Sequence, residues 1–297
     1  LASRQHMVSI GYVFEECLNR AKLKLEEIDV YAVTQGPGLI GSLLVGLSFA
    51  KGLAYYFKKP LIGIDHLEAH IESVFLESRE IPFPSLALVV SGGHTSSFFM
   101  KKKLLFELIG RTRDDAAGEA LDKIAKFLDL GYPGGPIIDR LAEKGNSRQF
   151  SFALPRMTDG SLDFSFSGLK TAALRQIKEN GISKSHPRFF DFLASFEMAV
   201  FQYLLQNMAQ AIDKLRPKSL ILCGGVARNK KLRECFKAVG QECRLPCFIP
   251  SPEFCTDNAA MVASLALEKI KSGEKPPSPF ALNAYPRIAP LQPISKK

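Results

Sequence analysis

The sequence predicts an α/β protein, and three observations support this fold class. Short apolar segments typical of buried strands alternate along the chain with longer segments typical of helices. Two of the apolar segments, 86–90 and 219–223, are followed by Gly-Gly pairs, in the first case after Ser91. A chain of 297 residues with 46% apolar content is also long enough to form two lobes with separate cores.

The first part of the chain predicts a helix, a strand and a second helix. Ile10, Phe14, Cys17 and Leu18 are spaced for one face of an amphipathic helix. Residues 30–34 are a predicted strand, and Gln35-Gly36-Pro37-Gly38 is a tight turn. A helix is expected over 39–57, and its apolar run of 12 residues (39–50) favours a buried helix over a transmembrane one.

The next segment carries two histidines four residues apart. Residues 61–64 predict a short buried strand, and Asp65 is a plausible N-cap for the helix that follows. His66 and His70 then project from one face of that helix and can bind a single metal ion. A surface pair of histidines is the alternative. Glu68 lies roughly 200° round the helix from His66, so it is misplaced to serve as the base of an H-E-x-x-H zinc protease.

The two Gly-Gly pairs are candidate phosphate loops. They occur in Ser91-Gly92-Gly93-His94-Thr95 and Gly224-Gly225-Val226-Ala227, about 130 residues apart. Glycines at a strand end let the backbone approach a phosphate and present N–H groups to it. Either loop alone also marks an ordinary turn. Together they fit a nucleotide held between two lobes.

A helix is expected over 114–128. Asp114 or Asp115 near its start favours the helix dipole, and Glu119 pairs with Lys123 one turn later. Asp122 is either a surface acid or one aimed into a cleft. Just before this helix, Lys101-Lys102-Lys103 connects a predicted hairpin of residues 97–100 and 104–108.

Asp257, in the C-terminal part of the chain, is a candidate for a third metal ligand. Cys255-Thr256-Asp257-Asn258 introduces a helix that runs through Leu267. Asp257 is conventionally an N-cap at such a place. As a ligand it would complete two imidazoles and one carboxylate, a set that leaves coordination positions open and suits iron(II) or zinc.

Composition indicates which binding partners and which cellular compartment to expect. The net charge of +9 suits an anionic partner such as RNA, although most lysines on any protein are merely solvated. The six cysteines lack paired C-x-x-C spacing, so we expect reduced thiols, a cytoplasmic location and no association with a membrane.

Taken together, these motifs match a family. The chain resembles the universal tRNA adenosine threonylcarbamoyltransferases (bacterial TsaD type), formerly described as sialoglycoprotein endopeptidases. The blocks that carry the resemblance are 1–6, 35–39, 66–70, 90–95, 114–119, 132–136, 164–171, 224–229 and 255–258.

The resemblance implies an actin/Hsp70-like (ASKHA) fold of two lobes. Lobe I would comprise 1–83 with 256–297 returning to it, and lobe II 84–255. Family members begin with a strand and a Gly-Ile-Glu-Thr-Ser-like loop before the position of Leu1, so we expect a first lobe that is incomplete at its N-terminus, as in a truncated sequence.

The resemblance also implies an activity. It is the transfer of the threonylcarbamoyl group from L-threonylcarbamoyladenylate to N6 of adenosine 37 in tRNAs that read ANN codons. The implied cofactor is one Fe²⁺ per subunit, with Zn²⁺ as an alternative, on His66, His70 and Asp257. The implied protein partners are a paralogous inactive subunit and a small ATPase. The implied substrate-binding residues are Val89, Val90, Ser91, Gly92, Gly93, Asp122, Gly135, Asp139 and Asn229.

Three other functions compete with this one. The glycine loops alone also suit an ATP-dependent kinase of the same superfamily, although such kinases generally use Mg²⁺ without a histidine pair. A non-catalytic, truncated assembly subunit would keep the fold without the activity. The position of Glu68 weakens the peptidase alternative.

Overall fold

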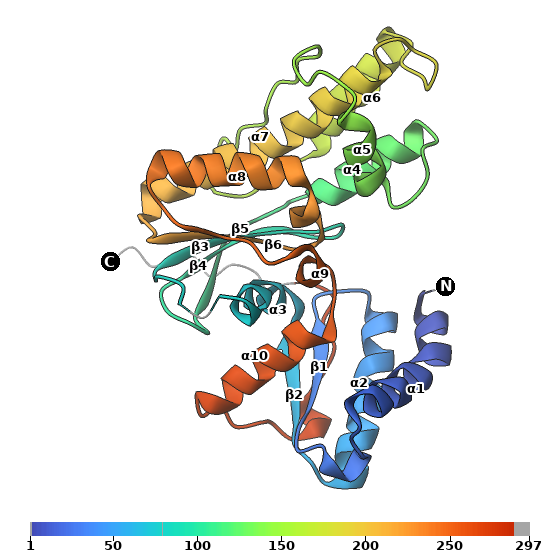
Figure 1. Cartoon of the computed structure of the whole chain (residues 1–297), viewed down its shortest axis with the longest axis vertical. Coiled ribbons are helices and arrows are strands. Elements are labelled where there is room, and N and C mark those ends of the chain that lie inside the picture. Colours follow the sequence, from blue (N-terminus) through green and yellow to red (C-terminus); the bar gives the residue numbers. More distant parts are fainter. Residues whose placement is uncertain (1, 79, 288–297) are drawn as a thin grey trace. The chain divides into compact units, whose positions relative to one another are not determined.

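The computed structural model describes residues 2–78 and 80–287 (Figure 1). The chain divides into two compact units: Leu1–Ser73 with Asn258–Lys297, here unit 1, and Val74–Asp257, here unit 2. The expected divisions after residues 83 and 255 are thus found after Ser73 and Asp257.

Unit 1 is built on two parallel strands, β1 (Tyr31–Gly36) and β2 (Leu61–Asp65), paired from Tyr31↔Leu61 to Thr34↔Ile64. Helix α2, with α1 outside it, covers one face of this sheet, and α10 covers the other (Figure 1). The helices of unit 1 are α1 (Ala2–Ala21), α2 (Ile40–Phe57), α3 (His66–Glu72) and α10 (Ala259–Lys271), with short 3₁₀ helices at Leu25–Glu27 and Pro279–Ala281.

The apolar faces of α1 and α2 differ from those expected. Phe14 packs edge-on against Phe49, with ring centroids 5.4 Å apart, but Cys17 is exposed and lies off this face. Helix α2 buries Leu47, Ala50 and Ala54, so it is not the fully buried helix that its apolar run predicted. By length and composition alone, α2 is also long and apolar enough to cross a membrane. One such helix among the described residues is weak evidence of a membrane span.

Unit 2 contains a five-stranded sheet in the order β5-β4-β3-β6-β7. Its strands are β3 (Ser85–Val90), β4 (Thr95–Met100), β5 (Phe106–Arg111), β6 (Ser219–Cys223) and β7 (Cys247–Phe248). Strands β3, β4 and β5 form an antiparallel meander, which confirms the hairpin expected around Lys101-Lys102-Lys103. Strands β6 and β7 add to β3 in parallel.

Helices of unit 2 gather over one face of this sheet (Figure 1). They are α4 (Ala117–Phe127), α5 (Gly134–Ala142), α6 (Ser167–Glu179), α7 (Phe189–Leu215) and α8 (Lys230–Cys243), while α9 (Pro252–Cys255) and 3₁₀ helices at Ser73–Leu76 and Gly225–Arg228 are short. Helix α7 is the central helix of the core, and its apolar side chains pack with the fully buried Phe164 and Phe166.

Helix α4 begins later than the sequence predicts. Its N-cap is Ala116, because both preceding aspartates bind elsewhere. Asp114 accepts hydrogen bonds from Ser165 Oγ (2.5 Å) and the Phe166 backbone N–H (2.8 Å). Asp115 pairs with Lys123 and Lys170, at 2.5 and 2.6 Å. The predicted Glu119–Lys123 pair is present, with its charged atoms 3.0 Å apart.

The parallel pairing of β3 and β6 places the two Gly-Gly loops side by side. Both strands end at the same edge of the sheet, where Val89 pairs with Cys223. Gly224 has φ +93°, and a Cβ on it would lie 2.4 Å from the carbonyl oxygen of Val90. The close approach of the two loops therefore requires glycine at this position.

Substitution of Gly224 by alanine tests this packing. Gly224→Ala is expected to lower the free energy of unfolding by about 2–4 kcal/mol, because the methyl group meets backbone and the positive φ is strained. Urea denaturation measures the effect. Gly225→Ala is the matched control, since a Cβ there meets nothing within 4 Å. Equal stabilities of the two variants would contradict the proposed close contact.

Candidate functional site

The two histidines lie where the sequence places them. Asp65 is the N-cap of α3, and its Oδ1 accepts hydrogen bonds from the backbone N–H groups of Leu67 (2.8 Å) and Glu68 (3.1 Å). This cap begins the helix at His66, so His70 follows one turn later on the same face. The imidazole centroids are 4.6 Å apart, and His70 is fully buried.

Asp257 is not the N-cap of α10, contrary to the conventional expectation. The cap is Asn258, whose Oδ1 accepts a hydrogen bond from the Met261 N–H at 2.9 Å. Asp257 directly precedes this cap, and its peptide bond joins it to the start of α10.

The three predicted ligands come together. One potential ligand atom from each of His66, His70 and Asp257 lies within 4.8 Å of the others. Within the described ranges, this is the one group of three such side chains close enough to hold an ion. Two imidazoles and a carboxylate fit iron(II) or zinc. Their role as ligands stays a prediction.

A tyrosine that the sequence analysis missed holds the start of α3. The Tyr285 hydroxyl donates a hydrogen bond to Asp65 Oδ2 at 2.6 Å, so both oxygens of this carboxylate are engaged. The Tyr285 backbone N–H donates to the Gln35 carbonyl at 2.9 Å. Burial, and then the charge of Asp65, raise the pKa of Tyr285, which therefore stays a donor.

Two glutamates on α3 bind α10. Glu68 forms an ion pair with Lys269 at 3.4 Å, and Glu72 accepts a hydrogen bond from Ser264 Oγ at 2.9 Å. Burial raises the pKa of Glu68, and Lys269 opposes this shift. These contacts fix the helix that carries the histidines to the helix that follows Asp257.

In unit 2, the predicted segment 89–93 comprises the last two residues of β3 and the start of the loop that follows. Val89 and Val90 are buried, whereas Gly92 and Gly93 are exposed, and a Cβ on either would meet nothing within 4 Å. Ser91 shapes the turn, because its N–H donates to the His94 carbonyl at 2.8 Å. The exposed backbone of this loop can approach a ligand closely.

Asp122 is neither of the two types of acid that the sequence left open. It lies on α4, and its Oδ1 accepts hydrogen bonds from the backbone N–H groups of Gly134 (2.7 Å) and Gly135 (3.1 Å). The carboxylate thus caps α5 from a neighbouring helix, which places predicted residues Asp122 and Gly135 in direct contact.

Asp139 lines a cavity of about 300 Å³ in unit 2, and Asn229 is hydrogen bonded to another residue of its lining. Asp139 lines this cavity together with Glu197, a buried residue of α7 that the sequence analysis missed. Asn229 is the N-cap of α8 and donates a hydrogen bond from its Nδ2 to Glu197 Oε1 at 2.8 Å. Burial, and then Glu143, raise the pKa of Asp139, whereas Lys230 lowers it.

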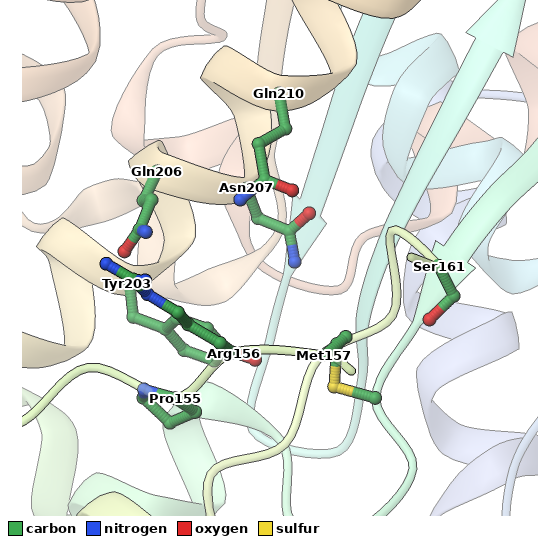
Figure 2. Close-up of a pocket in the computed structure, with 8 residues that line it drawn as sticks. All are labelled: Pro155, Arg156, Met157, Ser161, Tyr203, Gln206, Asn207 and Gln210. Carbon is green, nitrogen blue, oxygen red and sulfur yellow. The ribbon is translucent and has the colours of Figure 1, made fainter. Parts of the chain in front are cut away.

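A second cavity, of about 260 Å³, lies between α7 and the segment around Arg156 (Figure 2). It is lined by Pro155, Arg156, Met157, Ser161, Tyr203, Gln206, Asn207 and Gln210, none of which is a predicted site residue. Figure 2 shows the carboxamide side chains of this lining extending from one helix. Of the predicted residues of unit 2, Asp139 lines the first cavity.

The comparisons with known proteins agree with the motifs. The family described as tRNA N6-adenosine threonylcarbamoyltransferase (TsaD) matches residues 1–264. A protein of that name from Syntrophus aciditrophicus is 45% identical over 287 residues, which cover 97% of this chain and 84% of the relative. Another, from Clostridium perfringens, is 44% identical over 288 residues, with coverage of 97% and 84%.

Solved structures of lower identity share the fold. HypF from T. kodakarensis superposes with a TM-score of 0.60 at 14% identity, over 83% of this chain and 42% of HypF. Full-length HypF in a phosphate- and nucleotide-bound form gives a TM-score of 0.66 at 15% identity, over 90% and 51%. The chain therefore spans about half the length of these structural neighbours, and the likeness concerns the fold alone. By the family match and the sequence identities, the chain belongs to the tRNA N6-adenosine threonylcarbamoyltransferase (TsaD) family.

Proposed function

We propose that this protein transfers the threonylcarbamoyl group from L-threonylcarbamoyladenylate to N6 of adenosine 37 in tRNAs that read ANN codons. The family match over residues 1–264 carries the proposal. The geometry supports it at two places: the paired glycine loops of unit 2, and the cluster of two histidines and one aspartate.

The adenylate is proposed to bind at the edge where β3 and β6 end. The loops at Gly92–Gly93 and at Gly224–Gly225 offer backbone N–H groups to the phosphate, and glycine lets that backbone come close. Asp139, which lines the cavity of about 300 Å³, and Asn229, which is bonded to Glu197 of that lining, are proposed to offer polar groups to the nucleoside. These residues are among those that the family resemblance implies as substrate-binding.

His66, His70 and Asp257 are proposed to hold one Fe²⁺ per subunit, with Zn²⁺ as the alternative. A bound ion of this kind supplies a Lewis acid, which polarises a carbonyl group or neutralises a leaving phosphate. The contribution of the surrounding residues is to position the two histidines. Asp65 and Tyr285 fix the first turn of α3, on which His66 and His70 lie.

The partners follow from the family and from charge. A net charge of +9 suits tRNA as the acceptor. The paralogous inactive subunit, the small ATPase and a cytoplasmic location are proposed from the family resemblance.

Removal of a histidine tests the function and the metal together. His66→Ala is expected to lose bound iron and to slow threonylcarbamoyl transfer by at least about 100-fold, because two remaining ligands hold an ion poorly. Metal analysis and mass spectrometry of tRNA nucleosides measure the two effects, in a reaction that supplies the adenylate and the partner proteins.

His6→Ala is the matched control, because His6 is an exposed histidine on α1 and should change neither readout. A His66→Ala protein that lacks metal yet transfers at the wild-type rate would contradict the metal's role. Steady ATP consumption with a sugar acceptor, without tRNA modification, would favour the kinase alternative.

Removal of one hydroxyl tests how α3 is held. Tyr285→Phe is expected to weaken metal affinity about 3- to 10-fold, since one hydrogen bond to Asp65 is lost and the first turn of α3 is held less firmly. Competition titration of the metal-free protein with Co²⁺ or Zn²⁺ measures the affinity. Tyr56→Phe, at a tyrosine 78% exposed, is the control. Identical affinities of all three proteins would show that Tyr285 does not position the histidines.

A further inference from the structure

Glu197 is a buried acid for which the sequence analysis gives no role. It lies in the middle of α7 with 4% of its surface exposed, and it lines the cavity of about 300 Å³ beside Asp139. Buried carboxyl groups are costly unless they are paired or neutral. The hydrogen-bond partner of Glu197 is the carboxamide of Asn229, which carries no charge.

Two hydrogen bonds hold the Asn229 carboxamide. Asn229 Oδ1 accepts a hydrogen bond from the Leu232 N–H at 2.9 Å, while Nδ2 donates to Glu197 Oε1 at 2.8 Å. A flipped carboxamide would turn Nδ2 toward the Leu232 N–H, donor against donor, so the bond from Leu232 fixes the orientation. The Asn229 carboxamide nitrogen has two N–H donors, of which the bond to Glu197 uses one.

The surroundings favour a neutral Glu197. Burial, and then repulsion from Asp139, raise its pKa to about 8; Glu143 adds to this, and the bond from Asn229 opposes it. The group is therefore mainly protonated at neutral pH, and its carboxyl group can donate as well as accept a hydrogen bond. The other charged residues that line the cavity are Lys230, Lys231 and Glu234, all on α8.

We propose that Glu197 belongs to the nucleoside-binding part of the adenylate site, where its neutral carboxyl group holds Asn229 and donates a hydrogen bond to the adenosine. This inference rests on the proposed function, because it assigns a further residue to the same site. The physical reason for a neutral Glu197 is electrostatic. Beside Asp139, an ionised Glu197 would present a second negative charge to an anionic ligand and would lose its donor.

The pH dependence of nucleotide binding tests the proposal. Calorimetry of AMP and of adenosine binding is carried out at pH 7 and pH 9 on the whole protein. Wild-type affinity for both ligands is expected to fall about tenfold at pH 9, where a group with a pKa of about 8 is roughly nine-tenths ionised. Adenosine separates this effect from any change at the phosphate.

Three variants complete the test. Glu197→Gln keeps an acceptor for Asn229 and a donor for the ligand, so it should bind like wild type at pH 7 and show no loss at pH 9. Glu197→Ala should bind about 3- to 10-fold more weakly than wild type at pH 7 and show no further loss at pH 9, because Asn229 Nδ2 loses its acceptor and the ligand loses a donor. Glu234→Gln removes an exposed charge from the same cavity wall and should keep the wild-type pH dependence. Thermal melting verifies that each variant is folded.

The outcomes separate this inference from the function on which it rests. A wild-type affinity that is equal at pH 7 and pH 9, or a Glu197→Gln variant with the wild-type pH dependence, overturns the role of Glu197 while AMP binding itself stands. A wild-type protein that binds neither AMP nor adenosine overturns both this role and the proposed adenylate site.

Discussion

The parallel hydrogen bonding of β3 with β6 is the constraint on which the proposed nucleotide site depends. It joins strands that are more than a hundred residues apart in the chain, and it brings the ends of both to one edge of the sheet. The loops that follow can approach each other only because position 224 has no side chain. Open parallel sheets bind ligands at this edge, outside the carboxyl ends of their strands.

Within each unit, predicted site residues lie at or near helix N-termini, and a polar side chain fixes each of these helix ends. Asp65 caps α3 and is held in turn by Tyr285. Asp122 caps α5 across helices, and Asn229 caps α8 while bonded to Glu197. Such contacts tie the first turn of a helix, where ligand-binding groups commonly lie, to the core of its own unit.

Local patterns predicted the local features correctly. The strand before His66, its cap at Asp65, the lysine hairpin and the two strands before the glycine pairs could all be derived from periodicity and turn chemistry. Long-range contacts could not be derived in this way. Asp65 and Tyr285 are 220 positions apart, and Glu197 has no sequence motif that marks it as part of a site. Asp114 is a case where tertiary bonding to Ser165 and Phe166 replaced the expected role in the helix dipole.

Hydrogen exchange of the backbone amides, with and without AMP, tests the location of the nucleotide site most directly. The account predicts slower exchange in the loops at 91–93 and 224–229 when AMP is bound. Protection of 155–161 and 203–210, around the cavity of Figure 2, with no change at the two glycine loops would contradict it.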